Sequence, residues 1–205
     1  MLLGLTERAL LLYNRLTLQR AAMKITELQN LHRAGAIVRK AGHAQKLDIQ
    51  LDAAMTRELF RQEVGRVYFI VVNGEIAKIG GSQAKGGLKG TLGAYFTGFA
   101  KGMSARTYCV WNYMQQQLTQ GRSVEIYVTF APLVTATIPG PMGYVTVNIP
   151  VDYHTIEKSY VDHFVSVESK YPYLNMQESA GRWEDTGLLA GYHGLWVPQP
   201  ETLAE

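Results

Sequence analysis

Apolar residues recur every three to four positions along residues 6–34, with arginine and lysine between them. This spacing places the apolar side chains on one face and predicts a long amphipathic α-helix. Thr6 suits the N-cap of this helix, and Gly35 suits its end. Residues 52–63 predict a second helix. We therefore expect residues 1–65 to form an N-terminal helical arm.

After residue 65 the pattern becomes that of a β-hairpin. Residues 67–72 are β-branched and aromatic, and residues 76–80 form a second apolar run. Asn73 and Gly74 lie between the two runs. Because both residue types accept positive φ angles, this pair is preferred in a type I′ turn. The segment predicts two antiparallel strands joined by a tight turn.

Glycines interrupt the pattern between residues 81 and 102, where we expect loops with at most a short helix at residues 92–99. Regular patterns return further along the chain. They predict helices at residues 104–118 and 152–169, and a strand at residues 124–130. Valines and threonines around Pro139-Gly140-Pro141 predict an extra hairpin within residues 132–149.

The composition is that of an ordinary globular protein. Its 205 residues are 47% hydrophobic, which is enough to build a substantial core. The only cysteine is Cys109, which excludes a disulfide framework, and no two histidines recur at the spacing that puts both on one helix face. No stretch approaches the roughly 20 apolar residues of a membrane span. We expect a soluble, cytoplasmic protein.

Charge is unevenly distributed along the chain. Residues 1–110 contain 16 Lys and Arg against 7 Asp and Glu, whereas residues 111–205 contain 4 against 10. The net charge of +3 therefore combines a basic first half with an acidic second half. A basic surface favours a polyanion such as DNA, because phosphate contacts release counterions. A solvated helical surface would explain the same charges.

Two short motifs on the predicted hairpin, with two later residues, resemble the GIY-YIG nuclease family. Arg66-Val67-Tyr68 stands where the family has Gly-Ile-Tyr, and Lys78-Ile79-Gly80 stands where it has Tyr-Ile-Gly. Glu157 falls on a predicted helix, as the family's metal-binding glutamate does. Leu174-Asn175 is similar to the Leu-Asn that closes the family's core. The resemblance covers roughly residues 66–176.

The chain departs from the family pattern at the catalytic basic positions. Lys78 replaces the second tyrosine, and Arg66 replaces the first glycine. The family's arginine closely follows the second motif, but the first arginine found there is Arg106. We assign the role to Arg106, assuming an insertion before its helix, and keep Lys89 as the reserve.

The resemblance implies an α/β fold with a small antiparallel three-stranded sheet flanked by helices. Here that core would carry the N-terminal helical arm and an inserted β-hairpin. The expected division is an arm at residues 1–65, a GIY-YIG-like nuclease core at residues 66–176 and a C-terminal extension at residues 177–205.

The resemblance also implies roles for five residues. Tyr68 would accept or relay the proton of the attacking water, which requires its pKa of about 10 to be lowered by cations such as Lys78. Arg106 would bind the scissile phosphate. Glu157 would hold one Mg²⁺, with Mn²⁺ as a possible substitute. Asn175 would orient Glu157 or a neighbouring stretch of backbone.

Each of these residues also has a purely structural explanation. Tyr68 could belong to the core, Lys78 could be a solvated charge at a sheet edge, and Arg106 and Glu157 could lie on helix surfaces. Asn175 could stabilise a turn. It is their order along the chain, each on the expected element, that favours the nuclease.

A basic, glycine-rich stretch follows the second motif. It lacks the Gly-Lys-Ser/Thr ending of a phosphate-binding P-loop. We expect its lysines to contact the DNA backbone, and assign this role to Lys85, Lys89 and Lys101.

The implied activity is a Mg²⁺-dependent, sequence-specific endonuclease for double-stranded DNA, most like type II restriction enzymes. A palindromic target would require a homodimer. Two alternatives stay open. One is a non-catalytic DNA-binding or phage-assembly protein on the same scaffold, and the other is a nicking repair nuclease that recognises distorted DNA.

Overall fold

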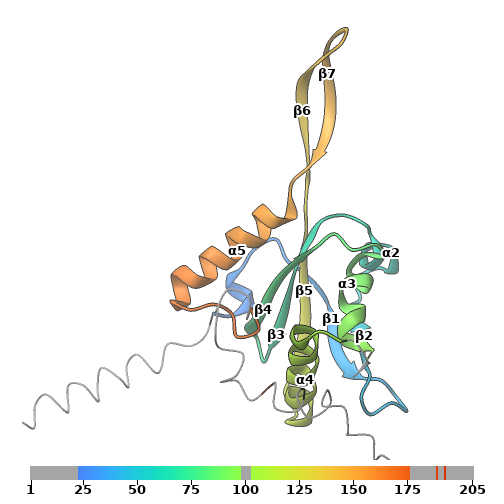
Figure 1. The fold of residues 1–205 in the computed structure, drawn as a ribbon, viewed down its shortest axis with the longest axis vertical. Coiled ribbons are helices and arrows are strands. Elements are labelled where there is room, and N and C mark those ends of the chain that lie inside the picture. Colours follow the sequence, from blue (N-terminus) through green and yellow to red (C-terminus); the bar gives the residue numbers. More distant parts are fainter. Residues whose placement is uncertain (1–22, 98–102, 176–187, 189–191, 193–205) are drawn as a thin grey trace, which may run out of the picture.

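The computed structural model describes residues 23–97, 103–175, 188 and 192. Five antiparallel strands form its central sheet in the order β2-β1-β5-β3-β4, and two further strands form a separate ribbon (Figure 1). The sheet strands are β1 (His32–Arg39), β2 (Leu47–Leu51), β3 (Arg66–Val72), β4 (Glu75–Ser82) and β5 (Val124–Phe130). The ribbon strands are β6 (Leu133–Gly140) and β7 (Gly143–Pro150).

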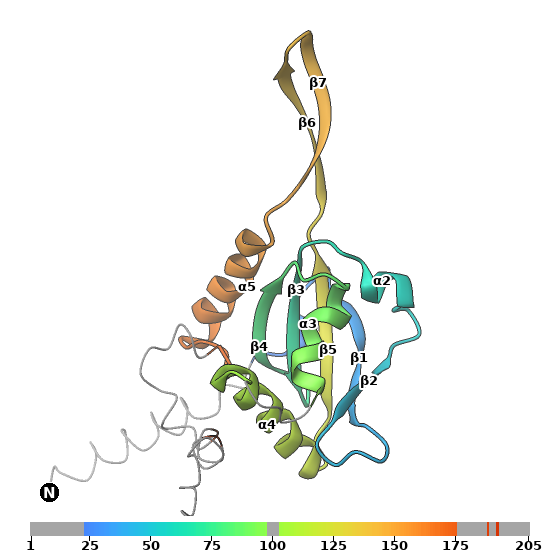
Figure 2. The same ribbon diagram turned by 45° about the vertical axis from the view of Figure 1, so that its right-hand side comes forward.

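Helices cover both faces of the sheet (Figure 2). The described helices are η1 (Ile25–Glu27), α2 (Arg57–Arg61), α3 (Gly87–Phe96), α4 (Ala105–Thr119) and α5 (Tyr153–Glu168). Side chains of α3 and α4 share one buried cluster with the sheet, and side chains of α5 share a second cluster on the opposite face. The sheet therefore separates two cores.

Strand β3 lies at the centre of this arrangement, and all seven of its residues are buried. Since side chains alternate along a strand, Val67 and Phe69 enter the α5 core while Tyr68 and Ile70 enter the α3 and α4 core. Burial on both faces explains the unbroken apolar run in the sequence.

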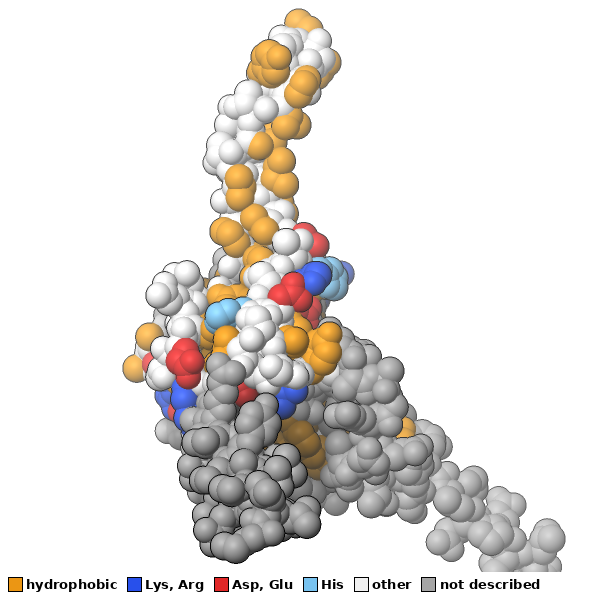
Figure 3. Space-filling view, turned by 90° about the vertical axis from the view of Figure 1, so that its left-hand side faces the viewer, with side chains coloured by type: hydrophobic (Ala, Val, Ile, Leu, Met, Phe, Trp, Pro, Cys, Tyr) orange, Lys and Arg blue, Asp and Glu red, His pale blue; other side chains and the backbone are white. Residues whose placement is uncertain are grey.

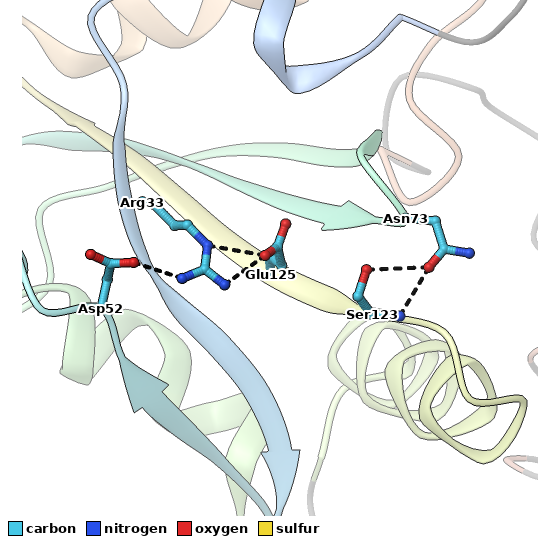
Figure 4. A network of polar contacts seen from close by, with 5 residues as sticks. All are labelled: Arg33, Asp52, Asn73, Ser123 and Glu125. Carbon is cyan, nitrogen blue, oxygen red and sulfur yellow. Dashed lines mark hydrogen bonds and ion pairs between the residues drawn. The ribbon is translucent and has the colours of Figure 1, made fainter.

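Polar contacts hold the outer strands in register (Figure 4). Arg33 on β1 donates to Glu125 Oε1 of β5 from Nε at 3.0 Å and from Nη2 at 2.6 Å, and Nη1 donates to Asp52 Oδ2 at 2.6 Å. At the β3–β4 turn, Asn73 Oδ1 accepts from the Ser123 backbone N–H at 2.9 Å. These contacts tie β1, β5 and the turn together.

The structure corrects the predicted three-stranded sheet and part of the helical arm. β1 and β2, which lie within residues 1–65, are strands of the same five-stranded sheet. The predicted helix at residues 6–34 is wrong at its described end, because β1 begins at His32; residues 6–22 lie outside the described residues. Gly35 is not a helix end. A Cβ there would collide with the Gln50 backbone, so this glycine lets β1 and β2 approach closely.

Two other predicted helices differ in extent. The helix expected at residues 52–63 is the short α2, which Thr56 caps by accepting from the Leu59 backbone N–H at 3.2 Å. The glycine-rich stretch contains the ten-residue α3, where we expected mainly loops.

The remaining described elements confirm the sequence predictions. The β3–β4 hairpin turns at Asn73 and Gly74, whose φ angles are 49° and 83°, as a type I′ turn requires. Helix α4 has Ser104 as its N-cap and helix α5 has Asp152. β5 and the extra hairpin also form as expected. Among the described residues, no helix combines the length and apolar character needed to cross a bilayer.

Candidate functional site

Tyr68 lies in the core with its ring directed across strand β4. It pairs with Gly80, and a Cβ added to Gly80 would lie 2.7 Å from both Cζ and Oη of Tyr68. The missing side chain of Gly80 therefore makes room for the phenol. The Tyr68 hydroxyl lies 3.0 Å from that of Tyr95 on α3, within hydrogen-bond distance.

Charged groups act on this pair of phenols. Burial raises the pKa of Tyr68 well above its ordinary value, and Tyr95 and the negative charge of Glu157 raise it further. The positive charge of Arg106 lowers the pKa of Tyr68, and it also lowers that of Tyr95, which burial raises. Tyr68 is thus a protonated phenol at neutral pH. The expectation that cations lower its pKa below the ordinary value is wrong, because desolvation outweighs Arg106.

Glu157 meets β4 from the opposite face, next to the Tyr68 position. A Cβ added to Gly81 would collide with Glu157 Oε2 and would lie 2.7 Å from Tyr153 Cδ2. Gly80 and Gly81 therefore admit one side chain from each face of the sheet, Tyr68 and Glu157. This explains why two glycines stand together in a strand, where glycine is otherwise unfavourable.

The Glu157 carboxylate suits a cation that takes a single protein ligand. Its side chain is 27% exposed, and His154 Nδ1 lies 3.9 Å from Glu157 Oε2. The described residues contain no group of three His, Cys, Asp or Glu side chains that could enclose a metal. Mg²⁺ is commonly held by one or two carboxylates, with waters and substrate phosphates completing its coordination. The residues present fit such a site.

Lys78 and Asn175 lie at the β4 side of the site. Lys78 pairs with Ile70, which puts it on the Tyr68 face, and its buried Nζ donates to the Leu174 carbonyl at 3.4 Å. Asn175 Oδ1 accepts from the Ile79 backbone N–H at 2.9 Å. Asn175 thus holds the backbone of the second motif, the second of the two tasks expected for it.

The two candidates for the basic role differ in their effect on Tyr68. Both Arg106 and Lys89 are exposed. Arg106 lowers the pKa of both Tyr68 and Tyr95, whereas no influence of Lys89 on Tyr68 is resolved. This electrostatic effect favours Arg106 over Lys89 for the basic role.

The lysines expected to contact DNA lie around the start of α3. Lys85, in the loop before α3, and Lys89, in its first turn, are both exposed. Lys101 lies outside the described residues.

Two residues of the region were given no role in the site from the sequence. Tyr95 shares its hydroxyl contact with Tyr68, and a buried stripe at Leu88, Leu92 and Tyr95 could have placed it on the inner face of a helix. Arg66, which replaces the family glycine, is fully buried.

Arg66 fastens β3 to the segment that follows β4. Its Nε donates to the Val64 carbonyl at 2.9 Å and its Nη2 donates to the Ala84 carbonyl at 3.1 Å. Nη1 lies 3.5 Å from Thr91 Oγ1 on α3. Arg66 therefore has a structural role next to Tyr68.

Replacing Arg66 should destabilise the protein. Arg66→Met keeps an apolar chain of similar length but removes the Arg66 donor from the Val64 carbonyl and one of the two donors from the Ala84 carbonyl. We therefore expect a loss of about 2–4 kcal/mol in the free energy of unfolding. Urea denaturation followed by circular dichroism measures this loss. The same change at the exposed Arg57 is the control and should cost less than about 0.5 kcal/mol. Equal midpoints for the two variants would contradict the structural role.

Similar solved structures include two nucleases. A variant of bacteriophage T4 EndoII is similar with a TM-score of 0.45 and 15% identity, covering 65% of this chain and 87% of that one. The restriction endonuclease HPY188I, in complex with product DNA, is similar with a TM-score of 0.43 and 19% identity, covering 75% and 86%. The chain matches no protein-family model and no curated protein.

Proposed function

We propose that this chain is a metal-dependent DNA endonuclease whose active site is built around Gly80 and Gly81. One observation carries the proposal. A phenol and a carboxylate come from opposite faces of the sheet to two adjacent glycines, while an exposed arginine acts electrostatically on the phenol. The charges of Glu157 and Arg106 both act on the buried Tyr68, with Glu157 raising its pKa and Arg106 lowering it.

The residues divide the work of hydrolysing a phosphodiester. Arg106 binds the non-bridging oxygens of the scissile phosphate through its planar guanidinium. Tyr68 orients the attacking water and takes its proton once its own phenol is deprotonated, and Tyr95 positions the Tyr68 hydroxyl. Lys78 adds positive charge on the same face, and Asn175 fixes the β4 backbone. Glu157 would hold a divalent cation, which would supply charge neutralisation at the phosphate and the leaving oxygen.

The finer features follow the family resemblance. We propose Mg²⁺ as the cation, with Mn²⁺ as a substitute, and sequence-specific cleavage of double-stranded DNA in the manner of type II restriction enzymes. The enzyme acts as a homodimer, one site for each strand. Lys85, Lys89 and Lys101 contact the DNA backbone. We propose that residues 66–176 form the nuclease core and residues 177–205 a C-terminal extension. Residues 1–65 form the N-terminal arm, whose strands β1 and β2 complete the sheet of the core.

The direct test is to incubate the protein with supercoiled plasmid in Mg²⁺, in Mn²⁺ and in EDTA. Discrete fragments that appear only with a divalent cation would support a restriction endonuclease. Nicked circles alone would favour a repair nuclease instead. Binding in a mobility-shift assay without any cleavage would leave the non-catalytic DNA-binding protein and reject the enzyme.

Gly81→Ala should reduce cleavage without altering any reacting group. The new Cβ would displace the Glu157 carboxylate, and a misplacement of about 1 Å can cost roughly a hundredfold in rate. We expect a loss of about ten- to a hundredfold in the rate of plasmid cleavage. Gly93→Ala is the matched control, since no atom lies within 4 Å of a Cβ added there. Equal rates for the two variants would show that Gly81 does not shape the site.

A further inference from the structure

The β6–β7 ribbon extends away from the sheet and from every helix of the described chain (Figures 1 and 2). It connects β5 to α5, the helix that bears Glu157. Residues 131–151 contain no Lys, Arg, Asp or Glu. An uncharged segment in an exposed position requires a physical explanation, because exposed strands are normally protected by charges.

The strand register sorts the ribbon into two unlike faces. Directly paired residues point to the same face, and successive pairs alternate. One set of pairs is wholly aliphatic, and we call it the aliphatic face: Val134 with Ile149, Ala136 with Val147, and Ile138 with Val145. The other face, which we call the polar face, carries Thr135 with Asn148 and Thr137 with Thr146 in its middle. Leu133 with Pro150 and Pro139 with Tyr144 lie at its two ends. Thr135 Oγ1 donates to Asn148 Oδ1 at 2.9 Å on that polar face.

The aliphatic face is open to solvent in the single chain. Val134, Ile138, Val145 and Ile149 are each 40–50% exposed. Hydrophobic side chains run along the ribbon in the space-filling view (Figure 3). A two-stranded ribbon is at best marginally stable in water, and a continuous apolar patch is uncommon on a monomer. The face therefore fits burial against a partner.

The chemistry of the ribbon limits what that partner is. DNA is held mainly through phosphate contacts from Lys and Arg, and the ribbon has neither. A matching surface must be aliphatic, uncharged and long. Among the described residues, the large exposed hydrophobics outside the ribbon are Val38, Tyr171 and Tyr173, which lie on separate segments. The described surface that complements the aliphatic face is the same face of another copy.

We propose that two copies of this chain associate through their aliphatic faces, ribbon packed on ribbon about a two-fold axis. Such an interface is self-complementary, and the two ribbons would pack as sheets do, about 10 Å apart. Eight residues per strand give a contact about 26 Å long. The interface gives the homodimer of the proposed function a location, but it does not depend on nuclease activity.

Sedimentation velocity of the full-length protein, without DNA or metal, tests the interface. At tens of micromolar, the sedimenting species should have twice the 22.8 kDa mass of one chain. The double variant Ile138→Lys with Val145→Lys puts two charges on the aliphatic face and should weaken the dimer at least a hundredfold. The matched control, Thr137→Lys with Thr146→Lys, places the same charges on the polar face of the neighbouring pair and should stay dimeric.

The possible outcomes are distinct. A monomeric wild-type protein would overturn the proposal, as would a dimer that survives the aliphatic-face charges or one that both variants dissociate. A variant that stays dimeric but no longer binds DNA would identify DNA as the partner of the ribbon. Circular dichroism confirms that each variant is folded. Tyr68→Phe should sediment as the dimer whether or not it cleaves DNA, which separates this proposal from the proposed function.

Discussion

Glu157→Gln should lower the rate of plasmid cleavage by about a thousandfold or more. The amide keeps the size of the side chain but removes the negative charge that would hold a divalent cation in the proposed mechanism, so the phosphate and the leaving oxygen would lose their main electrostatic stabilisation. First-order loss of supercoiled plasmid at saturating Mg²⁺ measures the effect. A mobility-shift assay in Ca²⁺ should show that DNA binding changes much less than cleavage.

Whether the cleavage rate falls or rises in Glu157→Gln distinguishes two roles for Glu157. Its charge raises the pKa of Tyr68, so removing the charge favours the phenolate. If Glu157 acted only through Tyr68, Glu157→Gln would therefore increase cleavage at neutral pH. Binding a cation predicts the opposite, a large loss.

Asp162→Asn is the matched control for Glu157→Gln. Asp162 lies on the same helix, is exposed and pairs with Lys158 at 2.7 Å. Removing this charge should leave cleavage within about twofold, since exposed pairs contribute little. Cleavage by Glu157→Gln within tenfold of wild type would reject the metal-binding role.

The elements around the site were predictable because local pattern and tertiary packing agree there. The β3–β4 hairpin combines an apolar run with a turn pair that favours positive φ angles, and both features act over a few residues. Ser104 and Asp152 mark helix starts through contacts two or three residues away. Such signals do not depend on the rest of the chain.

The outer strands were missed because their signal is not local. β1 buries Ala34, Gly35 and Ile37 only through its partners β2 and β5, and its register shifts between Arg33 and Gly35. In the sequence, the helical spacing of the preceding residues extends into this segment. Strand pairing overrides that periodicity, so the prediction omitted two of the five strands of the sheet.

The extent of helix α3 was underestimated because its local signal is unfavourable and its stability comes from packing. Gly87, Gly90 and Gly93 lower its intrinsic helix propensity, which favoured loops. Leu88, Leu92 and Tyr95 nevertheless bury one face against the core. Gly87 also touches the Arg61 backbone so closely that a Cβ there would collide with it. Packing thus stabilises a helix that propensity disfavours, and Tyr95 was missed with it.

The sequence named candidate residues for the site, but it could not give their electrostatics. The motifs marked Tyr68 and Glu157, yet the burial of Tyr68 depends on α3 and α4 packing over it. Desolvation by that packing fixes the direction of the pKa shift. The sequence does not show how strongly the folded protein desolvates Tyr68.

The pH dependence of cleavage should report the raised pKa of Tyr68. Only the phenolate can take the proton of the attacking water, and burial holds the pKa of Tyr68 above its ordinary value. Below that pKa, the phenolate fraction grows tenfold for each pH unit. We therefore expect the cleavage rate to rise about tenfold per unit between roughly pH 7 and pH 9, with no plateau.

Substitutions assign this profile to Tyr68 rather than to a metal-bound water, which would give the same slope. Tyr68→Phe should reduce cleavage by about a thousandfold and flatten the residual profile. Arg106→Ala should keep the slope but lower the rate at every pH, because Arg106 lowers the pKa of Tyr68 and also binds the phosphate. Tyr113→Phe removes a partly buried phenol whose pKa is also raised, and it should leave the profile unchanged. A flat profile in the wild-type protein, or full activity in Tyr68→Phe, would exclude Tyr68 as the base and leave it as a core residue.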